Sequence, residues 1–80
     1  MADRTLDASG LRCPMPLLKT KLVLNDMSAG EVLAVTATDP GSAKDIPAWL
    51  AMTGHTLVQK SESPEAWYFE IKCAANARSY

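Results

Sequence analysis

The sequence predicts an α/β (α+β) fold, a two-layer sandwich in which two helices pack on one face of a four-stranded mixed sheet. Three observations lead to this prediction. Segments with the apolar pattern of strands and segments with helical periodicity follow one another in the order βαβαββ. The last two strand segments are joined by a short polar loop, as in a β-hairpin. Two helices cover only one face of such a sheet economically, so the other face should carry Thr, Lys, Glu and Gln side chains.

The first strand and the first helix lie on either side of a short polar segment. Residues 5–8 alternate in polarity and place Leu6 and Ala8 on one face of a strand. From Met15 to about Asn25 a broad apolar stripe predicts a helix, and the stripe consists of Leu17, Leu18, Leu22, Val23 and Leu24. The polar and small residues that follow end this helical pattern.

The second strand gives the strongest strand signal in the chain. After Glu31, residues 32–38 form an apolar run that is typical of a strand buried in a sheet. Residues 39–42, Asp-Pro-Gly-Ser, have the composition of a turn.

A second helix should follow this turn. Ser42 and Asp45 have the spacing of a capping box, and Gly54 suits a left-handed helix C-terminus. One face of the helix is expected to be buried, and it consists of Ile46, Trp49, Leu50 and Thr53. Pro47 would delete a hydrogen bond inside such a helix, so an alternative is that the regular helix begins with Asp45 as its N-cap residue.

Two further strands are predicted at residues 56–60 and 66–73, and the polar loop between them makes a hairpin. Residues 74–80 are small and polar and should form a loose tail. A chain of 80 residues without an internal repeat is expected to be a single domain, residues 1–80, with its core at about 4–73. A domain of this size has room for a shallow binding site only.

The composition argues against several classes of protein. Hydrophobic residues make up 48% and charged residues 21%, which is typical of a soluble globular protein rather than a disordered or membrane one. The net charge is −1 and the eight basic residues are scattered, so we expect no direct nucleic-acid binding. The N-terminus leads into no apolar signal core and no apolar run has transmembrane length, so we expect a cytoplasmic protein without membrane contact.

One cysteine stands where the polar segment passes into the first helix. With Cys13 as the N-cap residue, Pro14 takes the first helical position and Pro16 the third, and neither removes a needed hydrogen bond. The positive end of the helix and the neighbouring Arg12 then favour the thiolate, which predicts a thiol pKa below the ordinary value of about 8.5. Gly10 permits a turn with positive φ and leaves room for a large molecule to approach the sulfur. A lone cysteine is more often a small buried hydrophobe, but that explanation does not account for this position.

Other residues that could take part in chemistry have a structural explanation. His55 is expected to be a polar residue just past the end of the second helix, with no third residue that suggests a triad. Cys73 is in register with the inward-facing residues of the last strand and should belong to the core, as should Trp49 and Trp67. His55 and the two cysteines, Cys13 and Cys73, are too dispersed along the chain to suggest a metal site.

Three lysines are open to two interpretations. Lys19, Lys21 and Lys44 form either a solvated surface or a positive rim near Cys13 for an acidic partner.

What remains is a nucleophile on a shallow surface, without a visible base, cofactor loop or pocket. This combination suits sulfur exchange between proteins, because a thiolate needs no general base.

Several short motifs together resemble the TusA (SirA-like) sulfur-carrier family over about residues 4–72. The central motif, Gly-Leu-Arg-Cys-Pro-Met-Pro at residues 10–16, is quite specific in this setting. The accompanying motifs are Leu6-Asp7, Gly30-Glu31, Thr38-Asp39-Pro40-Gly41-Ser42, Asp45-Ile46-Pro47 and Gly54-His55-Thr56-Leu57. The segment from Cys73 to the end is not explained by the pattern.

The resemblance implies a βαβαββ two-layer sandwich and a carrier that holds sulfur as a persulfide on Cys13. It also implies loading by a cysteine desulfurase or a rhodanese-type donor and transfer to an acceptor protein. From the residues themselves we expect no cofactor and no metal. One such relay ends in 2-thiouridine at the tRNA wobble position. Others serve sulfur oxidation or cofactor assembly.

Our leading interpretation is therefore a sulfurtransferase-type carrier. Cys13 carries the persulfide, Arg12 and the helix N-terminus stabilise negative sulfur, and Gly10 with Pro14 and Pro16 shapes the approach. The residues expected to contact a partner are Lys19, Lys44 and Asp45. The alternative is a redox-sensitive regulatory or interaction module that controls a partner through oxidation of Cys13 and does not turn over sulfur.

Overall fold

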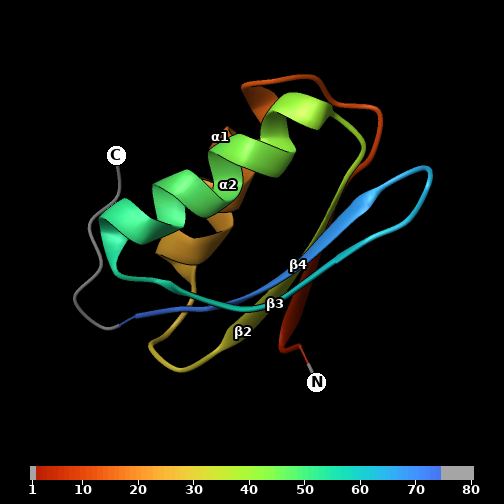
Figure 1. The fold of residues 1–80 in the computed structure, drawn as a ribbon. Coiled ribbons are helices and arrows are strands. Elements are labelled where there is room, and N and C mark those ends of the chain that lie inside the picture. The colour runs from red at the N-terminus through yellow and green to blue at the C-terminus, as the bar shows by residue number, and fades with distance from the viewer. Residues whose placement is uncertain (1, 75–80) are drawn as a thin grey trace.

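A computed structural model shows the architecture of residues 2–74 (Figure 1). The helices and strands follow one another in the predicted order βαβαββ. Their bounds are Arg4–Ala8 (β1), Met15–Asp26 (α1), Val32–Ala37 (β2), Pro40–Thr53 (α2), Thr56–Glu62 (β3) and Trp67–Lys72 (β4). Of the predicted loose tail, residues 75–80 lie outside the described residues.

The strands form one mixed sheet in the order β1-β2-β4-β3. β1 runs parallel to β2, whereas β4 is antiparallel to both of its neighbours. The predicted hairpin is confirmed, since β3 and β4 pair from Thr56 opposite Lys72 to Glu62 opposite Trp67. Both helices lie on one face of the sheet (Figure 1), so the predicted two-layer sandwich is confirmed.

The core lies between the helices and the sheet. Val35 of β2 and Phe69 of β4 face each other in register and are fully buried. The predicted face of α2 is also confirmed, since all of its members are buried: Ile46, Trp49, Leu50 and Thr53. Trp67, which we also expected in the core, is half-buried and packs against the edge of the cluster. Each large apolar side chain in such a cluster stabilises the fold by roughly 1.5–3 kcal/mol, so these contacts hold the two layers together.

The opposite face of the sheet carries polar side chains, as the sequence predicts. Thr36, Tyr68 and Glu70 alternate with the core residues of their strands and so point to this face. The Tyr68 hydroxyl donates a 3.2 Å hydrogen bond to the Glu70 carboxylate. Because the helices lie on the other face, a site built from helix ends lies at an end of the sandwich rather than here.

The start of α1 differs from the prediction by one residue. The N-cap residue is Pro14, not Cys13, and Pro16 takes the second helical position. The physical reason is the hydrogen bonding of the preceding turn: the Met15 N–H is bonded to the Arg12 carbonyl at 2.8 Å. The carbonyl of Pro14 then accepts the N–H of Leu18 at 3.0 Å. Cys13 therefore precedes the helix and does not cap it.

The start of α2 is also corrected. Asp39 is the N-cap residue, and its carboxylate accepts the Ser42 N–H at 3.1 Å. Neither the capping box headed by Ser42 nor Asp45 as N-cap is observed, because Pro40 at the first helical position already starts the helix. Pro47 lies inside the helix. The C-terminus agrees with the prediction, since Gly54 has a left-handed conformation with φ 89°.

Candidate functional site

The two loops that precede the helices meet at one end of the sheet. β1 and β2 are adjacent and parallel, so their carboxyl ends lie at the same edge, and each strand is followed by a loop and a helix. The Gly10 N–H donates a 2.8 Å hydrogen bond to the Thr38 hydroxyl and so joins the two loops. Gly10 has a φ of 79°, which other residues rarely adopt. Cys13 lies in the first loop, directly before the N-cap residue of α1.

Cys13 is held against the first turns of α2. Its Sγ donates a 3.0 Å hydrogen bond to Oδ2 of Asp45. Gly41 allows this close approach, because a Cβ at that position would lie 3.3 Å from the Cys13 Cβ and 2.9 Å from Oδ2 of Asp39. The start of α2 therefore brings two carboxylates to a thiol that remains exposed to solvent.

These carboxylates reverse the expected acidity of Cys13. The hydrogen bond to Asp45 is the main cause that raises the thiol pKa above its ordinary value, followed by desolvation and by the negative charges of Asp45 and Asp39. The prediction of a lowered pKa is wrong, for two reasons. Cys13 is not the N-cap residue, and no pattern along the chain shows that Asp45 of the neighbouring helix lies beside the thiol.

The other residues predicted to surround the sulfur have separate roles. Arg12 is exposed. Pro14 is also exposed and is joined to Cys13 by a cis peptide bond. Pro16 is buried in the first turn of α1, where its carbonyl accepts a 2.8 Å hydrogen bond from the Thr20 hydroxyl. Pro16 thus serves the packing of the helix, not the surface around the sulfur.

Of the three residues predicted to contact a partner, one lies beside the sulfur and two lie on the exposed surfaces of the helices. Asp45 is bonded to the Cys13 thiol, while Lys19 on α1 and Lys44 on α2 are exposed. Lys21 of the expected positive rim is half-buried, and its Nζ lies 5.6 Å from the centre of the Trp49 ring. The structure therefore brings Asp45 to the thiol and leaves Lys19 and Lys44 on the surface.

Sequence reasoning missed Thr38, Asp39 and Gly41 as neighbours of the cysteine. The local pattern of residues 38–42 indicates the end of a strand and a turn, and it contains no relation to Cys13. A signal was present, because the loops after two adjacent parallel strands meet at the same edge of a sheet. Parallel pairing of the first two strands would have placed these residues beside the sulfur.

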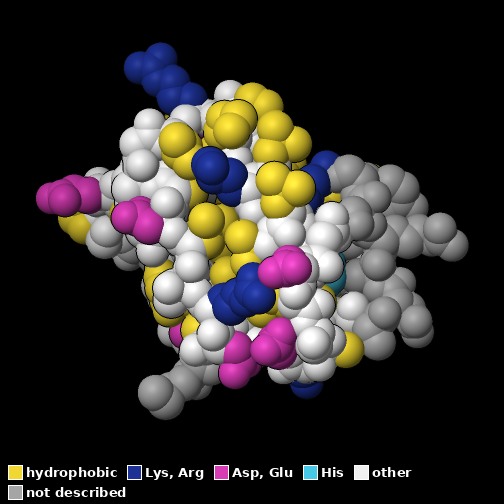
Figure 2. Space-filling model, turned by 180° about the vertical axis from the view of Figure 1, so that it is seen from behind, with side chains coloured by type: hydrophobic (Ala, Val, Ile, Leu, Met, Phe, Trp, Pro, Cys, Tyr) yellow, Lys and Arg dark blue, Asp and Glu magenta, His cyan; other side chains and the backbone are white. Residues whose placement is uncertain are grey.

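A row of exposed apolar side chains begins two residues after Cys13. Met15, Leu18 and Leu22 lie on one face of α1 and are 42%, 42% and 69% exposed. The helix lies behind α2 in Figure 1 and therefore faces the viewer in Figure 2, where hydrophobic side chains gather among Lys and Arg side chains. The thiol and this row together form a surface on which another protein could be bound.

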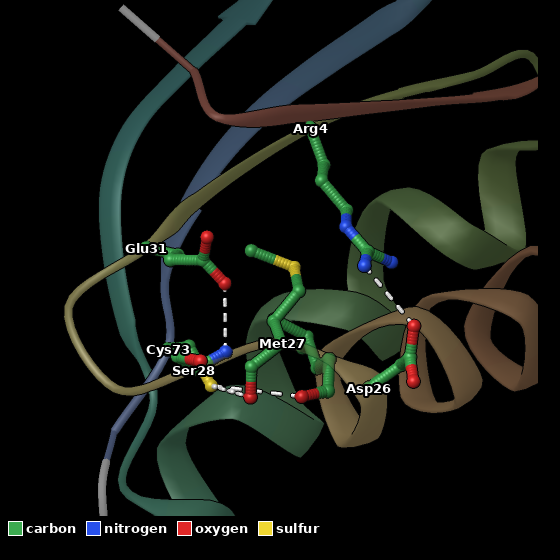
Figure 3. A network of polar contacts seen from close by, with 7 residues as sticks. Arg4, Asp26, Met27, Ser28, Glu31 and Cys73 are labelled. Atoms are coloured by element: carbon green, nitrogen blue, oxygen red, sulfur yellow. Dashed lines mark hydrogen bonds and ion pairs between the residues drawn. The ribbon is translucent and has the colours of Figure 1, made fainter.

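Cys73 lies at the other end of β2, away from Cys13. Its N–H donates a 2.8 Å hydrogen bond to the Glu31 carbonyl, directly before β2, and Ser28 and Glu31 close the same turn (Figure 3). Its Sγ is buried against the carbonyls of Leu24 and Met27 at 3.6 and 3.9 Å. The prediction that Cys73 belongs to the core is confirmed.

His55 also has a structural role, as predicted. Its Nδ1 accepts a 3.1 Å hydrogen bond from the Ala74 N–H, and its ring centre lies 5.5 Å from that of Trp49.

Within residues 2–74, no group of three or more His, Cys, Asp or Glu side chains is arranged to hold a metal ion. In the same part of the chain, no helix is long and apolar enough to cross a membrane.

Comparison with known proteins gives consistent results. The family model described as "Sulfurtransferase TusA" matches residues 4–73. The sulfur carrier protein TusA of Allochromatium vinosum is 51% identical over 70 residues, which cover 88% of this chain and 92% of that protein. The sulfur carrier protein TusA of Pseudomonas entomophila is 38% identical over 74 residues, 92% of each chain. The crystal structure of a SirA-like protein from Desulfitobacterium hafniense has the same fold, with a TM-score of 0.78 at 22% identity, covering 89% of this chain and 97% of that one.

Proposed function

This chain belongs to the TusA family of sulfur carrier proteins, and on that premise we propose that Cys13 is the residue that carries the sulfur, as a persulfide. The observation that supports this assignment is the contrast between the two cysteines. Cys13 is exposed at an end of the sandwich, whereas Cys73 is buried in the core. A sulfur atom that passes between proteins must be reached by both of them, and Cys13 meets this requirement.

Sulfur transfer at Cys13 is an exchange without net oxidation. The Cys13 thiol loses its proton, and the thiolate attacks the terminal sulfur of a persulfide on the donor. A bond forms between Cys13 Sγ and that sulfur, the sulfur–sulfur bond of the donor breaks, and its electron pair leaves with the donor thiolate. In discharge an acceptor thiolate attacks the terminal sulfur in the same way, and Cys13 leaves as a thiolate that is then protonated.

As a sulfur carrier, the protein interacts with other proteins of a sulfur relay. We infer that the donor is a cysteine desulfurase or a rhodanese-type protein, and that the acceptor serves tRNA 2-thiouridine synthesis, sulfur oxidation or cofactor assembly. The cytoplasm suits this exchange, because a reducing compartment keeps thiols free.

The surface beside Cys13 supports direct contact with such proteins. A donor that presents its persulfide to Cys13 also covers the neighbouring part of α1, including Met15 and Leu18, which are exposed. Lys19 is exposed on the same helix and would face acidic side chains of the partner. Lys44 is exposed next to Asp45 on α2 and would extend this contact.

The test is to incubate the protein with a cysteine desulfurase and cysteine and to measure its mass. We expect the wild type and the control Cys73→Ala to gain the mass of one sulfur atom, and Cys13→Ser to gain none. A wild type that gains no sulfur, or a Cys13→Ser variant that gains as much, would contradict the assignment. The alternative of a redox switch has less support, because redox-sensing cysteines have a lowered pKa whereas that of Cys13 is raised.

A further inference from the structure

The Asp45 carboxylate interacts with Cys13 in a way that depends on the chemical state of the sulfur. It accepts a hydrogen bond from Sγ at 3.0 Å, so it requires a proton on that sulfur. A carboxylate without its own proton offers only acceptors, and it cannot make this bond to a thiolate or to a disulfide-bonded sulfur.

Loading of Cys13 with sulfur removes its hydrogen bond to Asp45. In the persulfide, Sγ is bonded to carbon and to the second sulfur and has no proton left to donate. A hydropersulfide is a stronger acid than the corresponding thiol, so the terminal sulfur carries negative charge at neutral pH. Repulsion from Asp45 then replaces the hydrogen bond.

A second carboxylate, that of Asp39, acts on Cys13 in the same direction as Asp45. Asp39, the N-cap residue of α2, also disfavours negative charge on the sulfur. Its carboxylate is engaged with the Ser42 N–H at 3.1 Å, so it is held in place. Arg12 belongs to the same loop as Cys13 and its side chain is exposed. The charged groups that shift the pKa of the Cys13 thiol are thus the carboxylates of Asp45 and Asp39, and both raise it.

We propose that Asp45 is a positioning residue that stabilises the empty carrier relative to the loaded one and thereby favours release of sulfur to the acceptor. This inference rests on the proposed function of Cys13. The Cys13 thiol and Asp45 belong to different elements, and Gly41 brings α2 close enough for the contact. A carrier that binds sulfur weakly passes it on, because the equilibrium of exchange then lies towards the acceptor thiol.

The first experiment measures the empty protein and needs no sulfur donor. Alkylation of Cys13 by iodoacetamide is followed by mass spectrometry as a function of pH in the wild type and in Asp45→Asn, Asp45→Glu and Glu65→Gln. We expect Asp45→Asn to react roughly twofold to fivefold faster at neutral pH, with its pH profile shifted to lower pH. Asp45→Glu keeps the charge and should stay close to the wild type. Glu65→Gln makes the same change in net charge at an exposed loop position and should have no effect.

The second experiment measures the partition of sulfur between Cys13 and glutathione, starting from glutathione persulfide. We expect Asp45→Asn to retain roughly twofold to fivefold more sulfur at equilibrium than the wild type and Glu65→Gln. An unchanged pH profile and an unchanged partition in Asp45→Asn would overturn the role of Asp45, as would equal effects in Glu65→Gln. Failure of the wild type to gain sulfur from a cysteine desulfurase would overturn the proposed function itself, whereas the two results above concern Asp45 alone, so the two failures are distinguishable.

Discussion

Cys13 combines an exposed position with a thiol that keeps its proton. Because the thiolate is the reactive form, the raised pKa slows reaction with dissolved oxidants and electrophiles at neutral pH. A bound donor has a different effect, since it presents its persulfide at high effective concentration and so compensates for a small thiolate fraction. The carboxylates of Asp45 and Asp39 therefore suit a cysteine that reacts with docked proteins and not with solutes.

Gly41 is the residue on which this arrangement depends most directly. In an ordinary helical position, alanine in place of glycine stabilises a helix by about 1 kcal/mol. In Gly41→Ala the new Cβ would meet Oδ2 of Asp39 at 2.9 Å and the Cys13 Cβ at 3.3 Å. We therefore expect the opposite sign, a net loss of about 1 kcal/mol in the free energy of unfolding, measured by urea denaturation.

The matched control for Gly41→Ala is the reverse exchange on the same helix. Ala48 is exposed on α2, and Ala48→Gly should cost about 1 kcal/mol from helix propensity alone. If Gly41→Ala were more stable than the wild type, the close approach of α2 to Cys13 would not be a constraint.

At the scale of elements, the two helices differ in what they offer to the site. α2 contributes polar groups at its N-terminal end, where Asp39 caps the helix and Asp45 bonds to the thiol. α1 contributes an exposed apolar face that runs away from Cys13 along Met15, Leu18 and Leu22. The carboxylates at the N-terminal end of α2 thus set the acidity of the Cys13 thiol, and the exposed apolar side of α1 offers a contact surface for a partner protein.

The apolar face of α1 leads to a prediction about loading. In Leu18→Glu an exposed apolar side chain becomes charged, so a partner that buries this position loses apolar contact and must desolvate a carboxylate. We expect the rate of sulfur loading by a cysteine desulfurase to fall by roughly fivefold to tenfold, with the thermal stability unchanged. The measurement is the time course of persulfide formation by mass spectrometry.

Met52 provides the matched control for Leu18. It is 72% exposed and lies in the last turns of α2, at the other end of that helix from Cys13. Met52→Glu should load at the wild-type rate. Equal slowing in both variants would show that the α1 face has no special role.

For the whole molecule, local pattern predicts the elements and their layers, while the site depends on the pairing of strands. The spacing from Ile46 to Thr53 predicts the buried face of α2 because it reflects the period of the helix itself. The neighbours of Cys13 follow from a contact across 32 residues, the bond to Asp45, which no local pattern contains. The one-residue error at the start of α1 has a local cause: propensity does not distinguish Cys13 from Pro14 as the N-cap residue, and the turn in which the Met15 N–H bonds to the Arg12 carbonyl decides between them.

His55 links the end of α2 to the segment after β4 and gives the fold a dependence on pH. Its Nδ1 accepts the Ala74 N–H at 3.1 Å, which requires a neutral ring, and burial lowers its pKa below 6.5. The unfolded chain therefore binds a proton more readily than the folded one, so stability should fall as the pH drops below 6.5. The slope stays below the limit of about 1.4 kcal/mol per pH unit for one proton, because the ring is partly solvated.

The measurement is the melting temperature of the wild type and of His55→Asn at about pH 7.5 and about pH 5.5, on either side of the ordinary pKa of histidine. Asparagine offers an acceptor near the position of Nδ1 but does not titrate over this range. We expect the melting temperature of the wild type to fall further on acidification than that of the variant. Equal decreases would mean that protonation of His55 does not destabilise the fold, and that the contact between His55 and Ala74 survives at low pH.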